Sequence, residues 1–401
     1  EKHNLVCLLH EKPFEGINGS GKHNNWSLIT SDGVNLLDPG RTPAQNIQFL
    51  VFLMAVIKAV DDYADLMRIS ASGAGNDHRL GGNEAPPAIV SIFLGDELTA
   101  VLKSIENDTY FGKQEKIQLE TGAHVLPHFV QDSTDRNRTS PFAFTGNKFE
   151  FRMLGSSASV ATPNIVLNTA VAEALAQFYQ ELEGTRPEDI EHAVHELLKR
   201  AIRKHKKIIF NGNGYSEEWV KEAESRGLYN LVSTPDCLPR FIVEKNVELF
   251  TKHHIFTKDE IFSRYEILLE NYVKTILIEA KTLEEMLSKD FLPSVSAFAG
   301  QTAENATAKK AFLPALSMPA EEALVTKLTE TYTALTDGIA ELASLVTEAE
   351  SMDDMQKAAE FCQSRVLSRM EALRLTANAA ETLIPDSLLP YPTYDQLLFS
   401  L

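Results

Sequence analysis

NKFEFRM, residues 147–153, alternates apolar and charged side chains along its length. This alternation predicts a strand over 148–153. One of its faces would carry Phe149, Phe151 and Met153, and the other would carry Lys148, Glu150 and Arg152. The apolar face is typical of a core strand. The charged face has two interpretations, a solvated sheet surface or a site in which a carboxylate offers a metal ligand beside a guanidinium that clamps an anion.

A second strand is expected after the glycine-rich stretch GINGSGKHNNWSL, residues 16–28. The stretch is close to a P-loop, but His23 stands where Ser or Thr is needed and no helix follows, so a P-loop is excluded. Strand alternation puts His23, Asn25 and Ser27 on one face, a polar floor suited to a metal and a polyphosphate. The alternative is a structural histidine satisfied by its neighbours.

Two loops carry further candidates. DRNRTSP (135–141) holds Arg136 and Arg138, which either serve solubility or bind phosphate oxygens. HRLGGNEAPP carries Arg79 and Glu84 in a Gly- and Pro-rich loop, which is either an ordinary connection or a lid that presents a carboxylate.

The remaining patterns predict an α+β region followed by a helical one. The expected strands are 5–9, 25–30, 88–94 and 148–153, and the expected helices are 45–68 (begun by Thr42-Pro43), 164–182 and 187–206 (capped by Thr185). This mixture favours a largely antiparallel sheet with helices on one face. Apolar residues at helical spacing then predict long helices over 258–289, 319–350 and 352–383, typical of a bundle of antiparallel neighbours. We expect two domains, 1–240 and 241–401.

Bulk properties exclude some function classes. The formal net charge of -18 and the pI near 5.1 argue against nucleic-acid binding through a basic surface. Three cysteines with no CxxC pair indicate neither a zinc site nor a disulfide framework, and they favour a cytoplasmic location. The longest apolar run, 49–60, is too short to span a membrane. No signal peptide opens the chain, and the start at Glu1 reads as a fragment or a processed chain.

In order and spacing, these stretches resemble the glutamine synthetase family. NGSGKHNNWSL is similar to its NGSGMHxHxSL segment, RLGGNEAP to its R-x-x-x-G-x-E-A-P loop, and RNR followed by FEFR to its RNR…EVRF pair. KHNNWS, NKFEFRMLGSS, the bundle and the C-terminal YPTYDQLLFS resemble type III members in particular. The resemblance runs from end to end and implies the family's curved-sheet catalytic domain, followed by the type III helical bundle.

The resemblance also implies an activity, the ATP-dependent joining of ammonia to glutamate through a γ-glutamyl phosphate. It implies Mg²⁺ or Mn²⁺, the substrates glutamate, ammonia and ATP, and a homo-oligomer of stacked hexameric rings. The implied roles are metal binding by His23 and Glu150; glutamate binding by Asn18, Gly19, Arg79 and Arg152; nucleotide binding by Asn25, Ser27, Arg136 and Arg138; and catalysis by Glu84, Arg138 and Arg152. These roles require His23 and Glu150 to lie on adjacent strands and to face one polar hollow.

The sequence departs from the family pattern at three places. Asn25 stands where His is common, the loop between Arg79 and Glu84 is one residue shorter than usual, and the SPFAF run lacks an arginine that usually follows RNR. The family's other metal-binding glutamates and its small N-terminal domain would precede Glu1, so we expect this chain alone to be an inactive C-terminal portion. Two rival functions stay open: a γ-glutamyl ligase for another amine, and a non-catalytic scaffold assembled by the bundle.

Overall fold

The computed structural model describes residues 12, 16–109, 118–119, 129–130, 137–393 and 396. Contacts divide the chain into two compact units, the first ending at Tyr265 and the second running from Glu266. This division falls later than the predicted boundary after residue 240, because α9 (Glu244–Lys252) packs on the first unit. The domain assignment itself stays a prediction.

A small four-stranded sheet lies in the first unit. Its strands, in spatial order, are β1 (Gly21–Trp26), β6 (Phe149–Gly155), β5 (Phe142–Phe144) and β2 (Ile92–Phe93). β1–β6 and β6–β5 are antiparallel, but β5–β2 is parallel, so the sheet is mixed and the expected curved, largely antiparallel sheet fits only loosely. The parallel pair arises because the chain leaves β2 through helix α4 (Asp96–Glu106) before it reaches β5, and a crossover of this kind returns a strand in the same direction.

The structure confirms one of the predicted strands and shortens or shifts others. The strand over 148–153 is confirmed by β6, and the one over 25–30 overlaps β1 only through Asn25 and Trp26, because the chain then enters a turn in which Ile29 bridges Asn35. The strand over 88–94 shrinks to β2, and the one over 5–9 lies outside the described residues. A second sheet pairs β3 (Gln118–Leu119) with β4 (Phe129–Val130).

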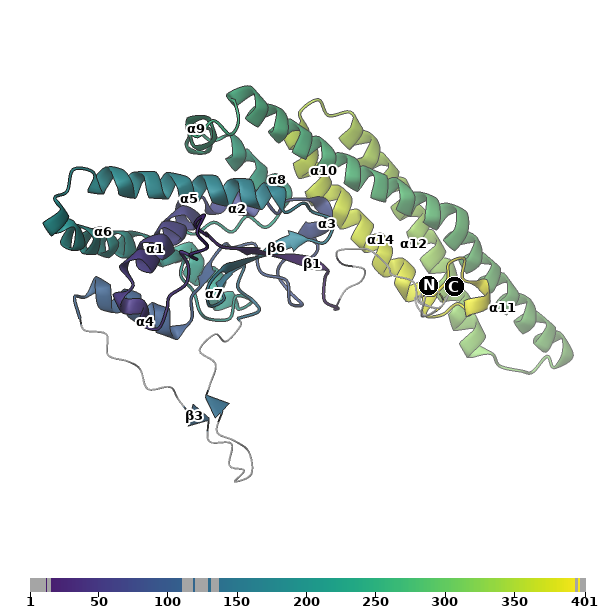
Figure 1. Ribbon diagram of the computed structural model, residues 1–401. Coiled ribbons are helices and arrows are strands. Elements are labelled where there is room, and N and C mark those ends of the chain that lie inside the picture. Colours follow the sequence, from purple (N-terminus) through teal and green to yellow (C-terminus); the bar gives the residue numbers. More distant parts are fainter. Residues whose placement is uncertain are drawn as a thin grey trace. The chain divides into compact units, whose positions relative to one another are not determined.

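The apolar side of the sheet is covered by helices. Phe142 stacks on Phe149 with ring centroids 4.7 Å apart, and Phe49 of α1 (Ile47–Asp62) approaches Phe144 at 6.0 Å. α1 packs in turn on α5 (Ala161–Leu182) and α6 (Ile190–His205), which run side by side in Figure 1. The helical nature of these segments and the end of α5 at Leu182 were predicted correctly, whereas the other ends were not. The helix predicted over 45–68 breaks at Tyr63 before α2 (Ala64–Ile69), and Asp189 rather than Thr185 caps α6.

A buried carboxylate joins α5 to α9. Glu173 accepts hydrogen bonds from Lys252 at 2.8 Å and Gln177 at 2.7 Å, and one oxygen lies 2.7 Å from His253 Nε2. Burial alone would raise the pKa of Glu173, but these hydrogen bonds outweigh burial and lower that pKa below its ordinary value. The charged form of Glu173 therefore stabilises the native fold.

The second unit is a helical bundle. Its helices are α10 (Lys258–Met286), α11 (Leu292–Phe312), α12 (Pro319–Glu350), α13 (Met355–Phe361) and α14 (Leu367–Glu381), with π-helical turns at Leu287–Phe291 and Cys362–Val366. The helix over 319–350 is confirmed, whereas α11 was not predicted. Among the described residues no helix is both long enough and apolar enough to cross a membrane.

One close approach within the bundle depends on a glycine. Gly338 of α12 is buried, and a Cβ placed there would lie 2.6 Å from Leu373 Cδ2 and 2.7 Å from Arg369 Nη2, both on α14. Arg369 also donates its Nε hydrogen to the Gly338 carbonyl at 3.3 Å. A residue without a side chain therefore lets α12 and α14 meet closely.

Candidate functional site

His23 and Glu150 meet across the β1–β6 pair. Asn24 pairs with Phe151 and Asn25 with Glu150, while the register shifts between Lys22 and Asn24, where β6 has one extra residue opposite His23. His23 Nδ1 lies 3.7 Å from Glu150 Oε2. The expectation that these two side chains lie on adjacent strands and face each other is confirmed.

The two faces of β1 differ as alternation predicted. Asn24 and Trp26 are buried and bond to α5, Asn24 Nδ2 to Asn164 Oδ1 at 2.8 Å and Trp26 Nε1 to Asn168 Oδ1 at 2.8 Å. His23 lies on the other face with its side chain 54% exposed. The sheet thus separates an α5-facing side from a polar side that holds His23 and Glu150.

Arg152 and Glu150 form a buried pair on that polar side. Arg152 donates from Nε and Nη2 to Glu150 Oε2 at 3.2 and 3.1 Å, and from Nη1 to the Asn137 carbonyl at 2.5 Å. Their side chains are only 4% and 7% exposed, so the charged face of β6 is not the solvated sheet surface of the first interpretation. Because Arg152 holds the Glu150 side chain in one orientation, the Glu150 carboxylate points toward His23.

The His23 and Glu150 pair fits one divalent cation. With ligand bonds of about 2.0–2.2 Å, two donor atoms 3.7 Å apart lie within reach of a single ion. The Glu150 carboxylate offers a hard oxygen ligand to the ion. Its negative charge would be shared between the ion and the neighbouring Arg152 guanidinium. The pair supplies two ligands, and an octahedral ion would need others from substrate, water or further residues.

Glu84 forms a second cluster with Arg138 and Asn18. Its Oε1 accepts from Arg138 Nη1 at 2.6 Å and its Oε2 from Asn18 Nδ2 at 3.0 Å. Asn83 and Glu84 both have positive φ, 50° and 67°, a conformation that costs energy in non-glycine residues. The structure therefore brings together three predicted site residues from three separate segments, on a strained loop.

Arg79 is placed differently from the other candidates. It is 3% exposed and donates to the carbonyls of Met153 at 3.1 Å and Arg152 at 3.1 Å. A Cβ on Gly21 would lie 2.1 Å from its Nη2 atom, so Gly21 leaves the room that the guanidinium occupies. Arg79 thus braces β6 beside the site, and its expected contact with a substrate carboxylate stays a prediction.

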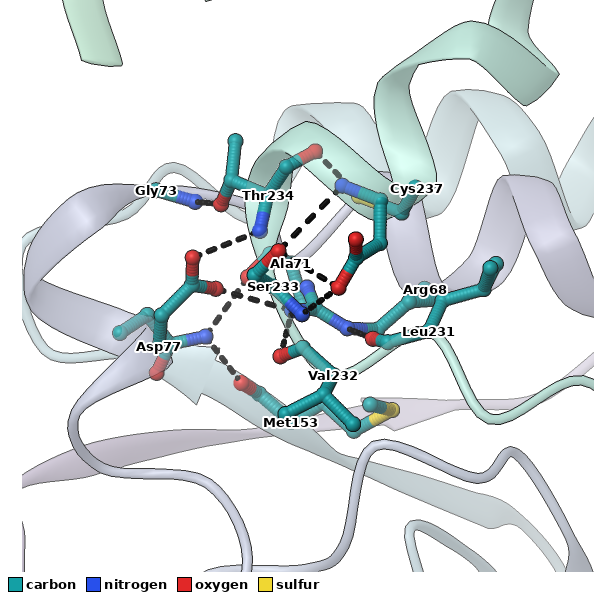
Figure 2. A network of polar contacts seen from close by, with 12 residues as sticks. Arg68, Ala71, Gly73, Asp77, Met153, Leu231, Val232, Ser233, Thr234 and Cys237 are labelled. Atoms are coloured by element: carbon teal, nitrogen blue, oxygen red, sulfur yellow. Dashed lines mark hydrogen bonds and ion pairs between the residues drawn. The ribbon is translucent and has the colours of Figure 1, made fainter. Parts of the chain in front are cut away.

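A polar network that the sequence did not predict anchors the base of the Glu84 loop (Figure 2). Arg68 donates to Asp77 at 2.8 Å and to the carbonyls of Leu231 and Val232, and Asp77 accepts from the Thr234 amide at 2.6 Å. Burial raises the pKa of Asp77, and the contacts with Arg68 and Thr234 oppose that shift. A buried arginine, bonded through Nε and Nη2, therefore fixes the chain immediately before residue 78.

The predicted nucleotide-binding residues are spread more widely. Asn25 is exposed, and Ser27 donates to Asn35 Oδ1 at 2.8 Å. Both border a groove of about 590 Å³ between β1 and α5, whose lining is Asn25, Trp26, Ser27, Leu28, Ile29, Asn164, Asn168, Val171, Ala172 and Leu175. Gly19 follows Asn18 in the turn before β1, and Arg136 lies outside the described residues. The nucleotide roles stay predictions.

Two other groups of potential metal ligands occur in the described part of the chain. They are Asp61, Asp62 and His205, and Asp108, His195 and Glu196. Lysines already face both groups, since Lys207 Nζ lies 3.6 Å from Asp61 and Lys199 bonds to Asp108. These are ion-pair clusters, so the His23 and Glu150 pair remains the candidate metal centre.

Comparison with known proteins bears on the whole chain. The family described as "Glutamine synthetase C-terminal domain" matches residues 193–310. A "Glutamine synthetase" of Butyrivibrio fibrisolvens is 48% identical over 100% of this chain and 57% of the relative. A "Type-3 glutamine synthetase" of Dictyostelium discoideum is 43% identical over 99% and 55%, and a "Glutamine synthetase" of Bacteroides fragilis 38% identical over 100% and 56%.

The chain spans about half the length of the curated relatives it matches. The similarity covers both the α+β unit and the bundle, and thus every segment that carries a candidate site residue. Over its whole length the chain is therefore similar to glutamine synthetases.

Proposed function

We propose that the protein to which this chain belongs joins ammonia to the γ-carboxylate of glutamate at the expense of ATP, through a γ-glutamyl phosphate. The observation that carries the proposal is the convergence of His23, Glu150 and Arg152 on the polar side of the sheet, with Glu84 and Arg138 meeting on the lid loop. The match to the glutamine synthetase C-terminal domain and the names of the relatives support it.

The residue types suit the steps of this reaction. His23 and Glu150 would hold Mg²⁺ or Mn²⁺, which supplies charge to the phosphate oxygens during transfer. Arg152, buried and fixed by Glu150, would face the transferring phosphoryl group or the substrate carboxylate. Asn18 and Gly19 would contact glutamate, and Asn25, Ser27, Arg136 and Arg138 the nucleotide.

Glu84 would have two tasks. An acyl phosphate hydrolyses readily, so the loop must exclude water once the intermediate forms. Ammonium is not a nucleophile, and a carboxylate within reach can take its proton. The ion pair with Arg138 directs the Glu84 carboxylate, which both tasks need.

Assembly and location are part of the same proposal. We propose a homo-oligomer of stacked hexameric rings in the cytoplasm, to which the free, buried thiols of Cys237 and Cys362 are suited. We further propose that residues 1–401 form one wall of the site and are inactive alone, since His23 and Glu150 supply two ligands where an octahedral ion takes six.

The test measures glutamine and phosphate formation by the full-length protein with glutamate, ATP, Mg²⁺ and a panel of amines. Glutamine formation with ammonia as the preferred amine is expected, and Glu84→Gln should lower it strongly. The matched control is Glu188→Gln, at an exposed carboxylate that pairs with Arg186. If the protein prefers another amine, that amine takes the place of ammonia in the proposed reaction. Phosphate release without any amide product would refute the proposed function.

Metal binding has a separate readout. Manganese titration by calorimetry should show weaker binding in His23→Ala than in the control His192→Ala, since His192 belongs to neither metal-ligand group. Equal affinity in both variants would remove His23 from the metal site. Robust glutamine formation by residues 1–401 alone would contradict the proposal that these residues form only one wall of the site.

A further inference from the structure

Asn137 stands between the two arginines of the RNR stretch, and neither strand alternation nor the resemblance gave it a role. Its backbone carbonyl accepts from Arg152 Nη1 at 2.5 Å and from the Ser140 amide at 3.2 Å. Arg152 therefore has two anchors, because Glu150 holds its Nε and Nη2 atoms and the Asn137 carbonyl holds its Nη1 atom. The orientation of the guanidinium thus depends on where this carbonyl points.

The side chain of Asn137 shapes the turn that presents its carbonyl. Its Oδ1 atom accepts from the Thr139 amide at 3.0 Å and from the Thr139 hydroxyl at 2.7 Å. An asparagine side chain that bonds to the backbone two residues ahead closes a tight turn. Because the Ser140 amide also bonds to the Asn137 carbonyl, the turn is closed by the backbone as well, and the carbonyl has a defined direction.

The amide group of Asn137 ties this turn to a distant loop, NGNGY, residues 211–215. Asn137 Nδ2 donates to the carbonyls of Gly212 at 2.6 Å and Asn211 at 3.2 Å. In the other direction, the Gly214 amide donates to Thr139 Oγ1 at 2.8 Å. A Cβ on Gly214 would lie 3.0 Å from the Thr139 carbonyl, so the loop packs closely on the turn.

The side chain of Asn211 fixes this loop to the end of β2 and the start of α4. Its Oδ1 atom accepts from the amides of Leu94 and Gly95 at 3.1 and 3.2 Å. Its Nδ2 atom donates to Thr99 Oγ1 at 2.9 Å. A continuous series of hydrogen bonds therefore links β2 and α4, by way of Asn211, to Asn137.

We infer that Asn137 is a positioning residue, which docks its amide on the 211–215 loop and thereby directs its carbonyl at Arg152. Arg152 in turn holds the Glu150 carboxylate toward His23, which lies 3.7 Å away. Removing a group that orients a metal ligand costs about 10–100-fold in metal affinity or activity. The inference rests on the proposed function for its effect on metal binding and catalysis, but not for the docking of the loop.

The experiment compares Asn137→Ala with the matched control Asn46→Ala in the full-length protein. Asn46 makes contacts of the same kind, since its Nδ2 atom donates to the carbonyls of Asp38 at 3.2 Å and Pro39 at 3.4 Å. Its Oδ1 atom accepts from the Phe49 amide at 3.0 Å, and these contacts belong to the start of α1. Both changes therefore remove an asparagine that bonds to three backbone groups.

Amide hydrogen exchange reads the docked turn directly. The Thr139 amide bonds to the Asn137 side chain, and the Gly214 amide bonds across the contact between the turn and the loop. Asn137→Ala should speed exchange at both amides, and Asn46→Ala should speed it at neither. Unchanged exchange at Thr139 and Gly214 in Asn137→Ala would overturn the inference.

Metal affinity gives a readout that a loss of stability alone would not move. In calorimetric titration with Mn²⁺ alone, Asn137→Ala should bind about tenfold more weakly than Asn46→Ala, near the lower end of the range for an orienting group. In an Arg152→Gln background the same change should have no further effect, because Asn137 acts through Arg152. Equal affinity in the two single variants, or a further tenfold loss in the Arg152→Gln background, would contradict the positioning role.

Asn137→Asp separates the two halves of the side chain and does not depend on whether the Arg152→Gln protein folds. A carboxylate keeps the acceptor for Thr139 but has no hydrogen to donate to the carbonyls of Asn211 and Gly212. Asn137→Asp should therefore match Asn137→Ala in hydrogen exchange at Gly214 and in Mn²⁺ affinity. Wild-type values in Asn137→Asp would remove the 211–215 loop from the inference and overturn it.

The outcomes also separate the inference from the proposed function. If exchange and Mn²⁺ affinity change as expected but the wild-type protein makes no glutamine, the proposed function fails and the positioning role stands. If the wild-type protein makes glutamine but Asn137→Ala behaves as Asn46→Ala does, the proposed function stands and the inference fails.

Discussion

Glu150→Gln should reveal how strongly the polar side of the sheet depends on one charge. The Glu150 side chain is 7% exposed, and it receives two hydrogen bonds from an arginine that is itself 4% exposed. Removing one partner of a buried ion pair costs about 3–5 kcal/mol because the other charge is left uncompensated. Glutamine keeps one acceptor for Arg152, so we expect Glu150→Gln to lower the free energy of unfolding by about 3 kcal/mol, near the lower end of that range.

Tryptophan fluorescence during urea unfolding isolates the relevant unit, because both tryptophans, Trp26 and Trp219, belong to the first unit. Trp26 also pairs with Phe149, directly beside the mutated residue. The measurement is made with a chelator present, so that a metal effect does not enter. Asp189→Asn, which breaks an exposed pair with Arg186, serves as control and should cost at most about 1 kcal/mol.

The double variant Glu150→Gln/Arg152→Gln sharpens the test. Removing both charges should cost less than the sum of the two single changes, since neither charge then remains buried alone. A loss of under about 0.5 kcal/mol in Glu150→Gln, or strict additivity in the double variant, would refute the description of this pair as a coupled, buried unit.

Three further predictions concern other parts of the chain. Gly21→Ala should destabilise the first unit by about 2 kcal/mol, since its Cβ would overlap the guanidinium of Arg79; a wild-type urea midpoint would contradict this. In the bundle, Gly300→Ala should raise the free energy of unfolding by about 0.5–1 kcal/mol through helix propensity. Gly338→Ala should not, because α14 leaves no room for the added methyl group. Equal changes in the melting temperature of the two variants would contradict this packing. Glu173→Gln should destabilise above pH 4.5, the ordinary pKa, and the difference should fade as the pH falls through the lowered folded-state pKa; a deficit undiminished at low pH would be inconsistent with a stabilising carboxylate.

Periodicity predicted those elements whose environment is uniform along their length. The strand over 148–153 and the helix over 319–350 were found because one face of each is continuously apolar. The mixed sheet escaped prediction because β2 has only two residues, and the direction of a strand pair is set by the chain path and not by local pattern.

The site was predictable as a set of residues and less so as a geometry. Alternation grouped His23 with Asn25 and Ser27 on one strand and Glu150 with Arg152 on the other, and the resemblance required His23 and Glu150 to meet, as they do at 3.7 Å. Alternation could not show that Arg79 turns into the strand backbone, because that depends on the space left by Gly21. Nor could it bring Asn137 to the carbonyls of Asn211 and Gly212, since this contact joins segments far apart in sequence and no local signal marks it.

The extra β6 residue opposite His23 makes the spacing of β1 matter as well as its composition. On either side of the bulge, each residue of β1 is matched to a defined partner on β6. One residue inserted or deleted between Gly21 and Trp26 would turn the indole toward water and the amides toward α5. A change in the length of GKHNNW should therefore disrupt the packing of β1 on α5 even where the composition of the segment is kept.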